Sequence, residues 1–81
     1  MKEIIYFNDR VRALAVIHGA ELLISAASNK DMGIYWMTIS GTGKSSSFEV
    51  SALEIMQASD LQHLNNLADS RFNAALKELD N

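Results

Sequence analysis

The stretch IYWMTISGTGKSSSFEV, residues 34–50, holds two apolar segments on either side of a glycine-containing turn. Aromatic and β-branched side chains dominate residues 34–40, a composition typical of a β-strand. Residues 47–50, with the sequence SFEV, predict a second, short strand. Gly41 and Gly43 lie between the two strands, and glycine readily adopts the positive φ angles of tight turns. The stretch therefore predicts a β-hairpin.

The sequence Gly43-Lys44-Ser45 within this turn also occurs at the end of phosphate-binding loops. Such a loop needs an earlier glycine five positions before Gly43, and that position holds Thr38, inside the predicted strand. It also needs a helix to begin at the lysine, whereas here the chain continues into a strand. We therefore expect residues 41–47 to be a solvated hairpin loop. A small-molecule binding loop is the alternative.

The C-terminal third predicts a short helix followed by a longer one. Ser51 and Glu54 have the S-x-x-E spacing of a helix capping box, and Ser59-Asp60 is a second cap signal. After it, apolar residues recur at intervals of three and four, which predicts one buried helical face. This face contains Leu61, Leu64, Ala68, Phe72, Ala75 and Leu79.

The N-terminal third permits two interpretations. Residues 2–7, KEIIYF, predict a buried strand ended by a cap at Asn8-Asp9, and residues 10–27 place apolar side chains on one face of an amphipathic helix. Alternatively, Gly19-Ala20 is a hairpin turn between the strands RALAVIH and ELLISAA, within an antiparallel β-meander followed by C-terminal helices. The alanine content favours the helix. The prediction is a single α+β domain over residues 1–81, in βαββα order, with a three-stranded sheet and a long C-terminal helix.

Composition argues against several classes of function. The chain has no cysteine, which excludes disulfides and thiolate metal sites and is most simply consistent with a cytoplasmic protein. No segment has the roughly 18 apolar residues of a membrane span. His18 and His63 lie on separate elements without the spacing of a metal site, and no serine has the setting of an activated nucleophile. We therefore expect no enzymatic activity, no metal and no cofactor.

The predicted central strand has two apolar faces. Side chains alternate along a strand, so Ile34, Trp36 and Thr38 face one way, whereas Tyr35, Met37 and Ile39 face the other. Either the helical segments cover both faces of the sheet, or both lie on one face and a second molecule covers the other. Aromatic residues concentrate binding energy at interfaces. The predicted partner interface consists of Tyr35, Trp36, Met37 and Lys44.

The leading hypothesis is a small protein-binding regulator or inhibitor that forms a homodimer. A phage-encoded inhibitor of a host nucleic-acid-processing enzyme is one concrete version. Direct nucleic-acid binding through Arg10, Arg12, Lys30 and Lys44 is an alternative, but the net charge of −3 and the lack of a basic patch do not favour it.

Overall fold

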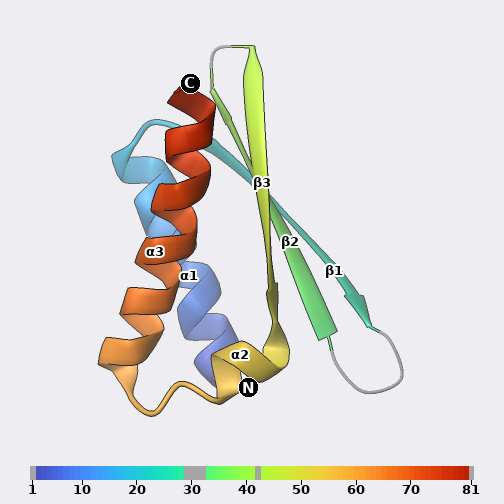
Figure 1. Cartoon of the computed structure of the whole chain (residues 1–81), viewed down its shortest axis with the longest axis vertical. Helices are drawn as coiled ribbons and strands as arrows, with labels where there is room; N and C mark the ends of the chain where they lie inside the picture. The colour runs from blue at the N-terminus through green and yellow to red at the C-terminus, as the bar shows by residue number, and fades with distance from the viewer. Residues whose placement is uncertain (1, 29–32, 42, 81) are drawn as a thin grey trace.

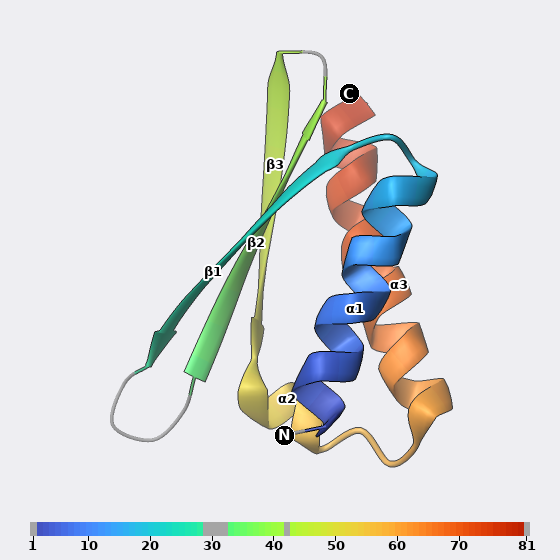
Figure 2. The same cartoon turned by 180° about the vertical axis from the view of Figure 1, so that it is seen from behind.

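The computed structural model describes residues 2–28, 33–41 and 43–80 of the chain. The first helix is followed by three consecutive strands and then by two more helices. These elements are α1 (Lys2–Ile17), β1 (Glu21–Ser28), β2 (Gly33–Gly41), β3 (Lys44–Ser51), α2 (Ala52–Met56) and α3 (Leu61–Asp80). Figure 1 shows the two long helices together on one side of the sheet, and Figure 2 shows the same two layers from behind.

The three strands form an antiparallel sheet in the order β1-β2-β3. The pairing register is continuous, with Met37 of β2 opposite both Ile24 of β1 and Phe48 of β3. At the β2–β3 turn Gly41 pairs with Lys44, and Gly43 has a φ of 76°. The predicted hairpin is therefore confirmed, but the predicted solvated loop over residues 41–47 is wrong in its second half, because β3 already begins at Lys44 and Ser46 is buried.

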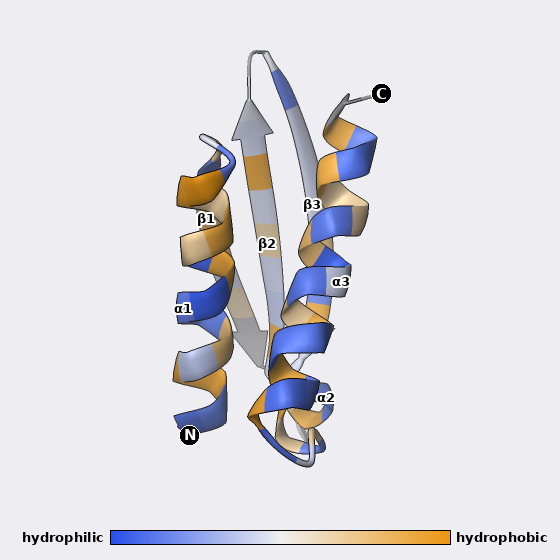
Figure 3. Cartoon of the chain, turned by 90° about the vertical axis from the view of Figure 1, so that its left-hand side faces the viewer, coloured by the Kyte–Doolittle hydropathy of each residue, from blue (hydrophilic) through white to orange (hydrophobic). Residues whose placement is uncertain are grey.

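The core lies between the sheet and the two long helices. Helix α1 lies at the β1 side of the covered face and α3 at the β3 side (Figure 3). Phe7 and Val11 of α1 and Phe72 of α3 are completely buried, as are Met37 and Ile39 of β2. Along α3 the predicted apolar face is buried except at its first residue, Leu61, which is exposed.

The predicted α+β class, the three-stranded sheet and the long C-terminal helix are confirmed, but the predicted order of elements is wrong. Residues 2–7 begin helix α1 instead of forming a strand. Ile4 and Phe7 continue, at intervals of three and four, the buried face that Val11 and Ala15 complete, so the apolar run belongs to a helical stripe. The predicted cap at Asn8-Asp9 therefore lies inside the helix.

The predicted helix over residues 10–27 is also wrong in its second half. Helix α1 ends at Ile17, and Gly19, with a φ of 67°, turns the chain into strand β1. The left-handed conformation at Gly19 is one that glycine adopts without the usual steric cost. The meander alternative correctly placed a turn here and a strand at ELLISAA, but its other strand, RALAVIH, is helical.

Candidate functional site

In the described part of the chain, one face of the sheet has no helix against it, because α1 and α3 both pack on the other face (Figures 1 and 2). The alternating burial along β2 places Trp36 and Thr38 on the uncovered side, which we call the open face. The pairing register places Trp36 in a row between Ser25 and Glu49. The adjacent row runs from β1 to β3 through Leu23, Thr38 and Ser47.

The apolar part of the open face lies over β1 and β2. Leu23 is 65% exposed and Trp36 is 41% exposed, while Ile34 is half-buried. The β3 part of the same face is polar, with exposed Ser47 and Glu49. The β3 part of the face is therefore an ordinary solvated surface, which reduces the apolar surface expected from the central strand alone.

Trp36 is held in position on this face. Its Nε1 donates a hydrogen bond to the Glu49 carboxylate at 3.1 Å, and the Thr38 and Ser47 hydroxyls are 2.9 Å apart in the next row. A ring fixed by its neighbours loses less conformational entropy when a partner binds. The open face is thus a partly preorganised surface with the Trp36 ring on its central strand.

The structure separates the four residues of the predicted interface. Trp36 lies on the open face, whereas Tyr35 and Met37 point toward the helices. Met37 is 0% exposed, so in this conformation it offers no surface to a partner, and Tyr35 is half-buried. Lys44 is exposed at the start of β3, beside the hairpin turn.

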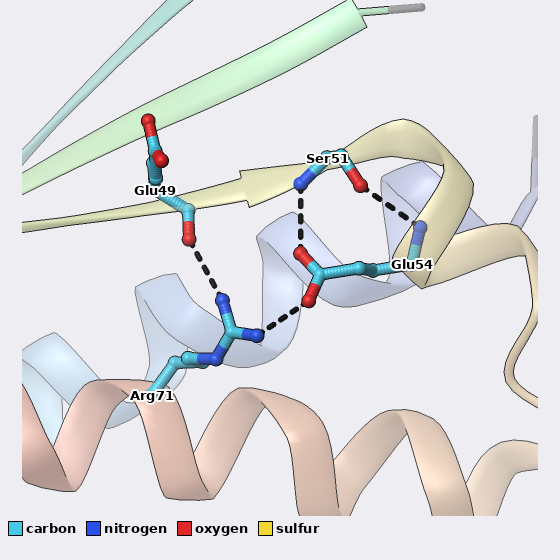
Figure 4. Close-up of polar contacts among 4 residues, drawn as sticks. All are labelled: Glu49, Ser51, Glu54 and Arg71. Carbon is cyan, nitrogen blue, oxygen red and sulfur yellow. Dashed lines mark hydrogen bonds and ion pairs between the residues drawn. The ribbon is translucent and has the colours of Figure 1, made fainter.

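The outer edge of β3 is occupied by side chains from the helices (Figure 4). Arg71 of α3 donates to the backbone carbonyl of Glu49 at 2.8 Å and also binds the Glu54 carboxylate. Glu54 of α2 accepts the Ser51 N–H at 3.1 Å, while its own N–H donates to the Ser51 hydroxyl, which completes the predicted capping box. We call Arg71, Glu54 and Ser51 the β3 guard.

The bonds of the β3 guard also change the pKa of one of its members, Glu54. The Ser51 N–H is the main cause that lowers the pKa of Glu54 below its ordinary value of 4.5. Burial acts in the opposite direction, and the Arg71 guanidinium lowers the pKa further. The sequence pattern indicates Ser51 and Glu54 only as a helix cap. Arg71 was missed because a single arginine on a predicted helix carries no signal of the strand edge that it reaches 22 residues earlier.

In the described residues, no side chain bonds to the outer edge of β1 as the β3 guard does at β3. The backbone groups of Glu49 and Ser51 point away from β2, and in an antiparallel ladder this direction alternates with each residue. Through the register across β2, the same alternation directs the backbone groups of β1 outward at every second residue, including Leu22, Ile24 and Ala26. Within residues 2–28, 33–41 and 43–80, no group outside the sheet bonds to them.

The histidines form no metal site in the part of the chain that the structure describes. The Asp60 carboxylate accepts a hydrogen bond from the backbone N–H of His63, so this predicted cap of α3 is confirmed. The His63 Nδ1 also lies 3.0 Å from the Asp60 Oδ1. The same backbone N–H lowers the pKa of Asp60. The His18 ring packs against Phe72 with their centroids 5.7 Å apart.

The four basic residues of the nucleic-acid alternative do not form one described patch. Arg10 makes two hydrogen bonds to the Asp69 carboxylate, at 3.0 and 3.1 Å, and Arg12 pairs with Asp9 at 3.3 Å. Lys30 lies outside the described residues. Lys44 lies at the β2–β3 hairpin, beside a hollow of about 250 Å³ that is also lined by His18, Leu76 and Leu79.

No protein-family model matches the chain, and neither a curated protein nor a solved structure shows significant similarity to it. In the described residues, no helix combines the length and the apolar character needed to cross a bilayer.

Proposed function

We propose that the chain is a small, non-enzymatic, cytoplasmic protein-binding domain that acts as a regulator or inhibitor and associates with itself. The partner protein covers the open face of the sheet, with Trp36 as its anchor. The observation that carries this proposal is a tryptophan that is 41% exposed on the central strand of the open face and held by Glu49.

The chemistry of the open face suits a regulatory interface. Non-obligate interfaces are about as polar as the rest of a protein surface, and they concentrate binding energy in a few aromatic side chains. Trp36 and Leu23 supply the apolar centre, and the hydroxyl and carboxylate groups around them supply the polar rim. The rim residues are Ser25, Thr38, Ser47 and Glu49.

The test is to capture partners with the tagged chain and then to compare two single variants. Trp36→Ala removes the anchor, whereas Leu53→Ala removes an apolar side chain of nearly equal exposure, 42%, on helix α2. Loss of an interface tryptophan costs about 2 kcal/mol or more of binding free energy. We expect Trp36→Ala to weaken binding of the captured protein at least about thirtyfold.

Leu53→Ala is expected to bind as the wild type does. A nucleic-acid-processing enzyme is the first partner class to assay, both for binding and for inhibition. Equal affinities of the wild type and Trp36→Ala for every captured protein would contradict the proposed role of the open face.

A further inference from the structure

We infer that a second copy of this chain pairs with the bare edge of β1, so that two three-stranded sheets become one continuous sheet around a two-fold axis. This inference rests on the self-association in the proposed function and adds the surface that mediates it. In the dimer the two open faces lie on the same side, and they merge into one surface with two Trp36 anchors.

The first observation is that the outward backbone groups of β1 match the spacing of another β-strand. Its outward backbone groups at Leu22, Ile24 and Ala26 repeat every second residue, and only another extended chain presents donors and acceptors at that spacing. Between Leu22 and Ser28 the strand has no charge and no proline, and its register shows no bulge. Proteins normally place such features on an exposed edge to prevent pairing.

The second observation identifies the occupant as a copy of this chain. One stripe of α1 contains Ile5, Asp9, Arg12 and Val16, all of which are between 58% and 79% exposed. At 100° per residue these four positions fall within a narrow sector, turned away from Tyr6 and Arg10, which contact α3. The stripe therefore lies on the flank of α1 away from α3, at the β1 side of the molecule (Figure 3).

This stripe complements itself when it is reversed. Its order along the helix is apolar, acidic, basic, apolar, so an antiparallel copy places Ile5 against Val16 and Asp9 against Arg12. The Asp9–Arg12 pair at 3.3 Å within each chain would then become part of a four-charge cluster. A strand from an unrelated protein would satisfy the backbone of β1 but would leave this stripe uncovered.

A single two-fold axis satisfies both contacts. The stripe is symmetric about the midpoint between residues 10 and 11, about 10 Å along the helix from its C-terminal end. The midpoint of β1, near Ile24 and Ser25, lies about 11 Å along the strand from its start. Because a short turn joins these two ends, the two midpoints lie at similar distances from that turn.

The antiparallel arrangement also separates the acidic ends of the two strands. Glu21 is at the start of β1, so antiparallel pairing places the two Glu21 side chains at opposite ends of the shared ladder. Parallel pairing would place them side by side, and because it turns the second sheet over, it would leave the two α1 stripes on opposite faces. The charges of the chain thus favour the antiparallel arrangement over the parallel one.

The experiment measures the molar mass of the purified full chain by light scattering and sedimentation over a range of concentrations. We expect the wild type to approach twice its chain mass of 8.9 kDa. Asp9→Arg and Arg12→Asp each place like charges together across the axis, and each is expected to weaken the dimer about tenfold or more. An equimolar mixture of these two variants should recover the mass of a dimer, because each supplies the charge that the other lacks.

A second pair of variants tests the strand edge. Ala26→Pro removes an outward N–H from β1 and should yield a folded monomer, whereas Ser47→Pro removes the corresponding outward N–H from β3 and should leave the dimer intact. If Ala26→Pro does not fold, Ala26→Lys tests the same edge without changing the backbone. Lys77→Glu on α3 controls for a change of charge away from the stripe, and should also leave the dimer intact.

A monomeric wild type at all concentrations, or a dimer that persists in Asp9→Arg and in the β1 edge variants, would overturn the inference. Neither result concerns partner binding by the open face: a monomer that still binds its partner through Trp36 retains the proposed partner binding and loses the proposed self-association. Conversely, a dimer with the expected responses whose Trp36→Ala variant binds every partner normally keeps the dimer and refutes the open face as the site.

Discussion

Strands β1 and β3 are both edges of the same sheet, but they differ in whether side chains bond to their outward backbone groups. Side chains from α2 and α3 bond to the outward groups of β3 at Glu49 and Ser51, while the outward groups of β1 have no comparable partner in the described part of the chain. Inward-facing Val50 of β3 is almost completely buried, whereas Ile24 of β1 is half-buried and Ala26 is exposed. The exposed apolar side chains of Ile5, Val16 and Leu23 lie on the β1 side.

This difference indicates which edge of the sheet is protected within a single chain and which edge is left for a partner. A monomeric protein normally protects the edges of its sheet from pairing with another chain. At β3 this protection comes from Arg71 and Glu54, which bond to outward backbone groups of the strand. The absence of the same treatment at β1, together with half-covered apolar side chains, is typical of a surface that a further polypeptide covers.

The largest expected effect is on the free energy of unfolding, and it differs between a core residue near β3 and one on β1. Phe72 of α3 is completely buried, and Phe72→Ala should lower the free energy of unfolding by about 3–5 kcal/mol. Ile24→Ala on β1 should cost roughly 1–2 kcal/mol, because its side chain is only half-buried. Urea unfolding of both variants in an Asp9→Arg background, which is designed to hold the chain as a monomer, provides the measurement. Equal losses would mean that the β1 side is as well covered as the β3 side.

A smaller effect is expected when the β3 guard is removed. Arg71→Met keeps the aliphatic stem but loses the bonds to Glu49 and Glu54, at an expected cost of about 1 kcal/mol, because both charged groups are partly exposed. With both edges bare, the variant should also form assemblies larger than a dimer at high concentration. Lys77→Met, on the same helix, should do neither. Wild-type stability and mass in Arg71→Met would show that the guard has no protective role.

The elements that could be predicted from the sequence are those whose local residue pattern agrees with their packing in the folded chain. The hairpin at residues 34–50 has strand-forming residues around two glycines, and α3 has both a cap at Asp60 and one continuous apolar face. Each of these elements could therefore be identified without knowledge of its neighbours.

The N-terminal third could not be predicted in this way because its local patterns conflict. KEIIYF is short and apolar enough for a strand, and only the burial of Ile4 and Phe7 together with Val11 shows that it belongs to a helix. In β1, alanines favoured a helix, while pairing with β2 decided the outcome. The site was predicted only in part: Trp36 is exposed on the open face, but alternation alone could not indicate that Met37 lies beneath the helices.

The smallest expected effect concerns the dependence of the β3 guard on pH. The pKa of Glu54 is lowered in the folded chain, first by the Ser51 N–H and then by Arg71, so the folded state favours the ionised carboxylate. The stabilisation from Glu54 is therefore complete above the ordinary value of 4.5 and is lost as the pH falls from there toward the lowered value. In Glu54→Gln this contribution is absent, so its deficit in unfolding free energy relative to the wild type should be largest above about pH 5 and should shrink in more acidic buffer. Leu53→Ala, one position earlier and without a titratable group, should show the same deficit at every pH. A deficit of Glu54→Gln that grows on acidification would have the opposite sign, and it would show that the Glu54 carboxylate is not what holds the outer edge of β3.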